Sequence, residues 1–278
     1  MRPNQIRQIG IVTRYELLKY LRGRRLLAII LLTVIISGIF LVVPPAIGSQ
    51  YSKDPTDFVM NMLRFLGVLS ILSATFFGAD AIVSEFESKT GYFLFPNPIR
   101  KTTIFLGKFI ASALVSVGAI ALYYLIAVAS VQVIDGSVPA NTGLSFAYAL
   151  VYLFAILAVA YLFSAMMRSS VYSLILTFFT FFLILPIVDA VGEVAKFKAW
   201  FSITFASGIA TDILRNPYPT DTVIATAGRG LGPGPATAGQ TVSVAQYYPS
   251  VTVSLAVMAA YFIVAFLLAI VLARRREM

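Results

Sequence analysis

The chain has 278 residues, of which 59% are hydrophobic and only 12% charged, and its mean hydropathy is +0.88. Soluble domains carry about 25% charged residues, and disordered chains combine low hydrophobicity with high charge. The composition therefore excludes a disordered chain and indicates an integral membrane protein. With neither Cys nor His, the chain lacks disulfides, thiolate and imidazole metal ligands, and the commonest general base.

Six apolar segments are long enough to cross a bilayer as helices, since a span needs about 20 such residues. They are residues 26–43, 65–83, 109–134, 144–167, 171–188 and 251–273. Pro44 and Pro45 are expected to stop the first helix, and Pro186 is expected to kink or end the fifth. The apolar block of the first segment exceeds that of a signal peptide, so we expect it to be retained as a span.

Lys and Arg residues in the connections predict the orientation of this bundle, because they concentrate on the cytoplasmic side of membrane proteins. With the N-terminus inside, 15 of the 21 Lys and Arg fall on the cytoplasmic side and 6 on the other. We therefore predict an all-α membrane protein with six spans, a single transmembrane domain over residues 1–278 and both termini in the cytoplasm. The net charge of +9 then faces anionic lipid or a protein partner at the plasma membrane, and nucleic acid is not required as a partner.

Three further segments are not simple spans. Residues 4–25 mix apolar and basic side chains at helical spacing, which is typical of a helix in the membrane interface; a plain basic flank is the alternative. Residues 84–107 are too apolar for a solvated loop, so we expect a short helix that docks onto lipid or another protein. Residues 192–249 are predicted to form an outer loop, whose Gly- and Pro-rich part indicates a linker or, alternatively, a lid.

The sequence carries little chemistry of its own. The Gly107-Lys108 pair is not part of a phosphate-binding loop, and no metal or catalytic constellation is recognisable, so we expect no enzyme activity. Ionisable residues of the spans lie near span ends, where contact with water is the simplest interpretation. They are Arg64, Asp80, Asp135 and Asp189. Because a coupled carrier needs such groups near the midplane, the energy for transport is expected to come from a partner.

This order of features resembles the permease subunits of ABC-2 type transporters, whose six spans work with a separate ATPase. The similarity is strongest in the first inner loop, which in that family has a Glu, a Gly- and Thr-containing turn, leucines, a Pro-rich element ending in Arg, and a Gly-Lys pair. The corresponding residues are Glu85, Thr90, Gly91, Phe93, Leu94, Pro96, Pro98, Ile99, Arg100, Gly107 and Lys108. The N-terminal segment is similar to the interfacial elbow helix of the family. Its matching residues are Arg14, Glu16, Leu17, Arg24 and Arg25.

The resemblance implies an ATP-driven exporter. In that arrangement, residues 84–107 are the coupling helix, which lies in a groove of a cytoplasmic ABC ATPase. A second permease copy, identical or similar, completes the path, and ATP and Mg²⁺ are bound by the ATPase, with no cofactor in this chain. Two other hypotheses remain: a membrane anchor that holds an ATPase without translocation, and an autonomous carrier or channel, which the missing midplane charges disfavour.

Overall fold

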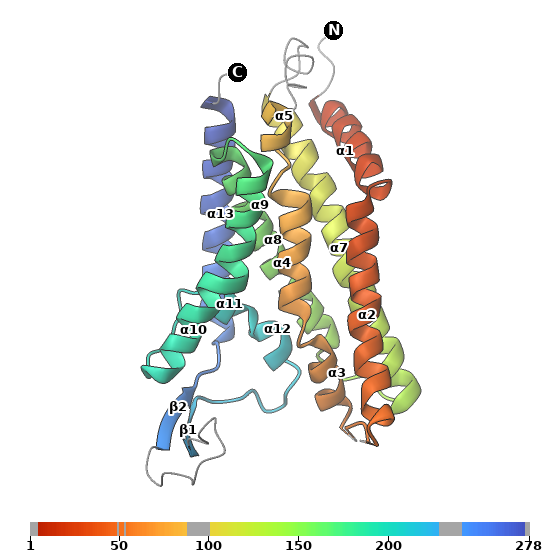
Figure 1. The fold of residues 1–278 in the computed structure, drawn as a ribbon, viewed down its shortest axis with the longest axis vertical. Helices are drawn as coiled ribbons and strands as arrows, with labels where there is room; N and C mark the ends of the chain where they lie inside the picture. The colour runs from red at the N-terminus through yellow and green to blue at the C-terminus, as the bar shows by residue number, and fades with distance from the viewer. Residues whose placement is uncertain (1–4, 49, 53, 88–100, 228–240, 276–278) are drawn as a thin grey trace, which may run out of the picture.

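Six helical spans run between two ends of the molecule (Figure 1). The computed structural model describes residues 5–48, 50–52, 54–87, 101–227 and 241–275. We call the end at which α1 begins and α13 ends the basal end, and the opposite end distal. The helices and strands in chain order are α1 (Gln5–Leu21), α2 (Arg24–Ala46), α3 (Pro55–Leu63), α4 (Leu66–Gly78), α5 (Val83–Glu87), α7 (Lys101–Ile134), α8 (Thr142–Met166), α9 (Ser170–Phe179), the π-helical turn η1 (Thr180–Ile184), α10 (Leu185–Val194), α11 (Ile203–Ser207), α12 (Ile209–Asp212), β1 (Thr222–Ala227), β2 (Thr241–Gln246) and α13 (Val251–Arg275).

Helices α4 and α8 form the centre of the bundle. In the second span, 78% of the residues in its most apolar stretch are buried, against 11% in the fifth span. Helix α8 packs against α4 and α13 through alanines and aromatic residues, while α7 packs against α1, α2 and α4. Helices α4 and α8 approach closely at Gly78, where a Cβ atom would lie 2.8 Å from Leu157 Cδ1 and 3.0 Å from Ala160 Cβ. The prediction of an all-α bundle with six spans is confirmed, with one small β-hairpin added.

The first span continues past its two prolines, contrary to expectation. Pro44 and Pro45 lie inside the last turn of α2, where they remove the N–H donors that would reach the carbonyls of Phe40 and Leu41. The Tyr51 hydroxyl donates to the carbonyl of Leu41 and replaces one of these donors. A proline pair is tolerated here because it lies in the last turn of the helix, so only two helical hydrogen bonds are lost and one of them is replaced.

The second span, Pro55–Glu87, is interrupted between α3 and α4 and again between α4 and α5. Its first part, α3, begins at Pro55 after Asp54, whose carboxylate accepts a hydrogen bond of 2.8 Å from the Thr56 N–H. The second part, α4, ends at Gly78, and the chain turns before α5. The segment predicted as one helix over residues 65–83 is therefore broken near its basal end.

The fifth span does not end at Pro186 and extends beyond its predicted limit at residue 188, to Val194. Pro186 has no N–H to donate to the carbonyl of Phe182, and the chain contains a π-helical turn just before it. The ring of Phe178, at the end of α9, stacks on that of Phe182 within this turn, with centroids 4.8 Å apart.

The chain that connects α10 to α13 forms a distal layer. It contains the short helices α11 and α12 and the antiparallel pair β1–β2, in which Thr222 pairs with Gln246. Neither strand was predicted. Asp221 stabilises this layer. One of its carboxylate oxygens accepts a hydrogen bond of 2.6 Å from the Tyr248 N–H, and the Lys198 ammonium lies 2.9–3.0 Å from both carboxylate oxygens. The hydrogen bond from Tyr248 and the charge of Lys198 lower the pKa of Asp221 although burial opposes them.

Asp212, at the end of α12, makes the distal layer sensitive to pH. Burial raises the pKa of its carboxyl to about 6 from its ordinary value near 3.8, although Arg215 opposes the shift. The folded chain therefore binds this proton more tightly than the unfolded chain does. Its contribution to the free energy of unfolding is present at low pH and is lost as pH rises through 6. Between pH 4.5 and 7.5 the free energy of unfolding decreases by about 2 kcal/mol. We expect thermal unfolding, followed by Trp200 fluorescence, to move to lower temperature over this interval, and Asp212→Asn to abolish most of that difference; an unchanged difference would contradict this assignment.

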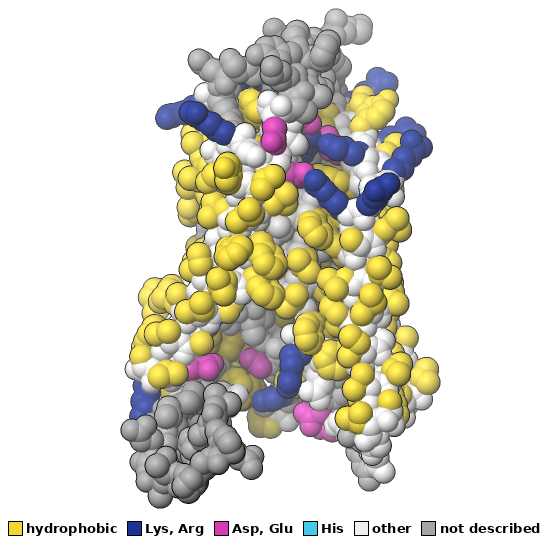
Figure 2. Space-filling view, viewed as in Figure 1, with side chains coloured by type: hydrophobic (Ala, Val, Ile, Leu, Met, Phe, Trp, Pro, Cys, Tyr) yellow, Lys and Arg dark blue, Asp and Glu magenta, His cyan; other side chains and the backbone are white. Residues whose placement is uncertain are grey.

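The outer surface is apolar in the middle and basic at the basal end. Figure 2 shows hydrophobic side chains over the central part of the visible face, with Lys and Arg residues gathered near the basal end. Large exposed apolar residues include Leu27 on α2, Leu125 on α7 and Leu267 on α13. This distribution matches a bundle surrounded by lipid along its length, with basic residues at one head-group layer.

Candidate functional site

The candidate site is the basal junction, where α1, the break between α4 and α5, and the start of α7 meet. Helix α7 begins at Lys101, earlier than predicted, and extends the third span toward the basal end. Of the loop predicted as the coupling element, residues 84–87 and 101–107 are described. The predicted contact residues Thr90, Gly91, Phe93, Leu94, Pro96, Pro98, Ile99 and Arg100 lie outside the described residues.

Lys108 is the centre of this junction. Its ammonium lies 2.6 Å from Glu16 Oε1 and 2.7 Å from Glu85 Oε1, and the three side chains are only 4%, 13% and 14% exposed. The second oxygen of Glu16 makes no hydrogen bond, but Lys19 lies 3.6 Å from it. The buried Lys108 ammonium is thus paired with two carboxylates, and such pairing is the condition under which buried ions are tolerated. The cluster ties α1 and α5 to α7.

Gly107 brings α1 directly against α7. A Cβ atom at this position would lie 2.7 Å from Cβ and Cγ1 of Val12 and 3.2 Å from the carbonyl oxygen of Ile9. The missing side chain also leaves the Gly107 carbonyl accessible to the Thr13 hydroxyl, which donates to it at 3.2 Å. The Gly-Lys pair therefore has two roles: glycine permits the close approach and lysine supplies the charge.

The end of α4 is held by side chains from three other helices. The Ser112 hydroxyl donates to the Phe77 carbonyl at 2.7 Å, and the hydroxyls of Tyr20 and Tyr161 lie 3.1 and 2.7 Å from Ser112. Burial raises the pKa of Tyr20 to about 12, so its phenol stays protonated and donates to the same carbonyl at 3.3 Å. A broken helix inside a membrane needs such partners for its free carbonyls.

The turn after α4 is fixed in the same way. Ser164 on α8 accepts hydrogen bonds from the backbone N–H groups of Ile82 and Val83, at 2.9 and 3.1 Å. Asp80 is buried and pairs with Arg25 at 2.5 Å, so the expectation that Asp80 meets water is wrong. Polar side chains of α2 and α8 thus hold the turn between α4 and α5 in place.

The end of α5 is connected to the fifth span. Glu87 accepts a hydrogen bond of 2.9 Å from the Ser170 N–H and one of 3.3 Å from the Ser169 hydroxyl. A carboxylate at this position interacts favourably with the positive end of the α9 dipole. A displacement of α5 would therefore move the start of α9 as well as the start of α7.

The structure brings some of the predicted site residues together and leaves others at the surface. Glu16, Glu85, Gly107 and Lys108 meet at the junction, whereas Arg14 and Arg24 are exposed. Leu17 packs beside Tyr20 in a small apolar cluster with residues of α4 and α7. Arg25 donates a second hydrogen bond, of 3.1 Å, to the Phe76 carbonyl. The sequence analysis missed Tyr20, Ser112 and Ser164, because hydroxyl side chains in apolar spans carry no pattern that separates them from ordinary packing residues.

Six apolar helical spans with basic residues at one end define an α-helical polytopic membrane protein. The family profile described as "ABC-2 family transporter protein" matches residues 44–271. The chain therefore belongs to the ABC-2 transporter family and is a membrane permease of an ABC transporter rather than a catalytic subunit. No curated protein matches the sequence.

Proposed function

We propose that this chain is the permease of an ATP-driven exporter and that the basal junction transmits the movement of a cytoplasmic ABC ATPase to the spans. The basal end is then cytoplasmic, α1 is the interfacial elbow helix, and residues 84–107 include the coupling helix. A second copy of the chain or a similar permease completes the translocation path in the plasma membrane. ATP and Mg²⁺ belong to the ATPase, and this chain needs no cofactor.

The observation that carries this proposal is the Lys108 ion cluster. The segment between α5 and α7 is the proposed docking loop, and Glu85 and Lys108 lie on its two flanks, 2.7 Å apart. A force applied to the loop reaches α1 through Glu16 and the Gly107 contact, α4 through the turn at Asp80, and α9 through Glu87. Two packed arrangements of this junction would give the bundle two states, and ATP would select between them through its different affinity for each.

The contact with the ATPase is proposed to rest on apolar side chains of the loop. Phe93, Leu94 and Ile99 would be buried in the ATPase groove, with Arg100 at its rim. Changing the three apolar residues to Asp places charges in this contact. We expect the triple variant to insert normally and to lose the ATPase.

The test is extraction of the tagged chain from its native membrane in mild detergent, with mass spectrometry of the copurified subunits and measurement of ATP hydrolysis. A matched control carries Asp at three apolar residues of the distal end, Ile47, Val133 and Val194, which are 71%, 86% and 60% exposed. The unchanged chain and this control should retain a stoichiometric ABC ATPase, whereas the loop variant should not. Retention of the ATPase by the loop variant would overturn the docking assignment, and its absence from the folded, unchanged chain would overturn the proposed function.

A further inference from the structure

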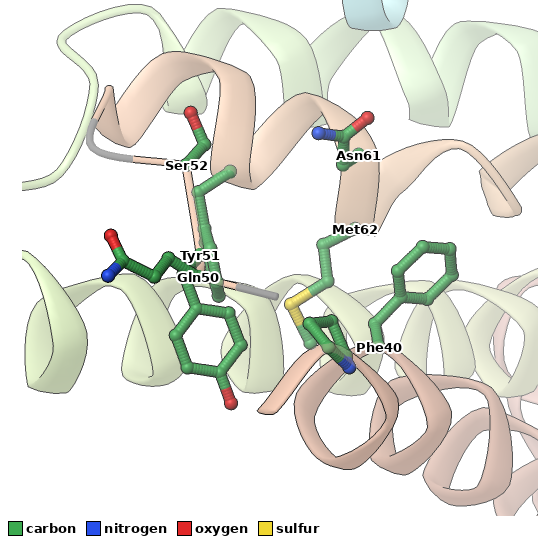
Figure 3. A pocket seen from close by; sticks show the side chains of 8 residues that line it. Phe40, Gln50, Tyr51, Ser52, Asn61 and Met62 are labelled. Atoms are coloured by element: carbon green, nitrogen blue, oxygen red, sulfur yellow. The ribbon is translucent and has the colours of Figure 1, made fainter. Parts of the chain in front are cut away.

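A pocket of about 220 Å³ opens at the distal end, between the end of α2, the loop after it and α3. It is far along the spans from the basal junction. Its lining is apolar below and polar at the rim. The eight residues are Phe40, Pro44, Gln50, Tyr51, Ser52, Phe58, Asn61 and Met62. Figure 3 shows the Met62 side chain reaching from α3 into the space between the rings of Tyr51 and Phe40.

The walls of this pocket are held in place by contacts within the lining and with the helices behind it. The Tyr51 hydroxyl is bonded to the Leu41 carbonyl, and the Tyr51 ring meets Phe58 edge to face with centroids 5.7 Å apart. On the other wall the Tyr123 hydroxyl donates to the Met62 carbonyl. A lining fixed in this way forms a binding site before the ligand arrives, which reduces the entropy lost on binding.

The chemistry of the lining selects the kind of ligand. The eight described lining residues are all uncharged, which favours an uncharged ligand over an ion. The aromatic rings and the Met62 thioether favour a flat apolar body. Gln50, Ser52 and Asn61 also line the pocket, and their amide and hydroxyl oxygens can accept a hydrogen bond from a ligand N–H or O–H. The volume is below the roughly 300 Å³ at which pockets for drug-sized ligands begin.

We propose that the pocket between α2 and α3 binds a small uncharged molecule that has one ring or a short alkyl body and at least one N–H or O–H donor. This ligand reaches the pocket from the distal side. The site is separate from the proposed ATPase contact and does not depend on the proposed function.

The test uses a benzamide that carries a trifluoromethyl diazirine on its ring, irradiated with the full chain in phosphatidylcholine nanodiscs. Mass spectrometry should locate saturable labelling at Tyr51 or Met62, and unlabelled benzamide should compete with it. Methyl benzoate has the same ring and carbonyl but no donor, so we expect it to compete about fivefold less well, the effect of one hydrogen bond.

Two substitutions fill the pocket from different sides. Met62→Trp occupies its interior, and Ser52→Trp covers its rim without changing a helix; we expect each to lower saturable labelling about tenfold or more. The control is Val133→Trp, an exposed residue at the distal end of α7, which should leave labelling unchanged. Unchanged labelling in both pocket variants would overturn the proposal. So would labelling that lysophosphatidylcholine removes and benzamide does not, because the space would then hold a lipid chain.

Discussion

Replacing Lys108 with Met is expected to lower the free energy of unfolding by about 3–5 kcal/mol, the usual effect of leaving a buried charge without its partner. Glu16 and Glu85 each lose an ammonium that lies within 2.7 Å, and the two carboxylates then repel one another in a region with little water. We expect lower yield of folded protein and a lower midpoint of thermal unfolding in detergent. ATP hydrolysis by the copurified ATPase should also become independent of the permease.

A compensated variant separates the charge imbalance from the loss of packing. When Glu16→Gln and Glu85→Gln are combined with Lys108→Met, no buried charge is left alone, so most of the lost stability should return. The coupling should not return, because the neutral side chains no longer link α1 and α5 to α7 by ion pairs. Lys19→Ala serves as the surface control, since its side chain is 59% exposed and its pairing with Glu16 is worth little. If the single Lys108→Met variant were as stable as the unchanged chain, the role of the cluster would be disproved.

Gly107→Ala is expected to separate α1 from α7 at a cost of about 1–3 kcal/mol, the usual effect of overpacking. The added methyl group would lie 2.7 Å from two carbon atoms of Val12, and the backbone of Ile9 prevents it from moving aside. Hydrogen exchange at the backbone of α1 should therefore become faster, and the hydrogen bond from Thr13 should be lost.

The same substitution eleven residues further along α7 provides the matched control. Gly118 has no atom within 4 Å of the position of an added Cβ, so Gly118→Ala meets open space and removes a glycine from a helix interior. We expect this variant to be as stable as the unchanged chain or slightly more stable. Equal exchange rates for α1 in the two variants would show that the close approach at Gly107 is not required.

Much of the fold follows from hydrophobicity alone, because lipid demands long apolar helices and charged residues mark their ends. The positions of interruptions within the helices do not follow from it. Pro45 lies inside α2 because it stands in the last turn, and the Leu41 carbonyl, which loses its helical donor, has a tyrosine partner instead. Gly78 ends α4 although it looks like any small residue in an apolar span, and the break depends on Ser112 and Ser164, which are distant in sequence.

The candidate site was predictable in part. The motif resemblance selected Glu85, Gly107 and Lys108 together and Glu16 separately, but nothing in their spacing indicated that Glu16 and Lys108 form an ion pair across 92 positions. Asp80 was misinterpreted because its position near a span end favours water, whereas the fold brings Arg25 to it. Which charges pair depends on how the helices pack, and that information is not local in the sequence.

The contact between α1 and α7 also has a consequence for synthesis at the ribosome. Helix α1 is made before the residues against which it packs, Gly107 and Lys108, which emerge about ninety positions later. Until then, Glu16 on α1 lacks its pairing with Lys108, and the end of α4 lacks the Ser112 hydroxyl. Two spans are therefore inserted before the N-terminal helix can take its final place, so a chain truncated before the third span would leave α1 without its docking surface.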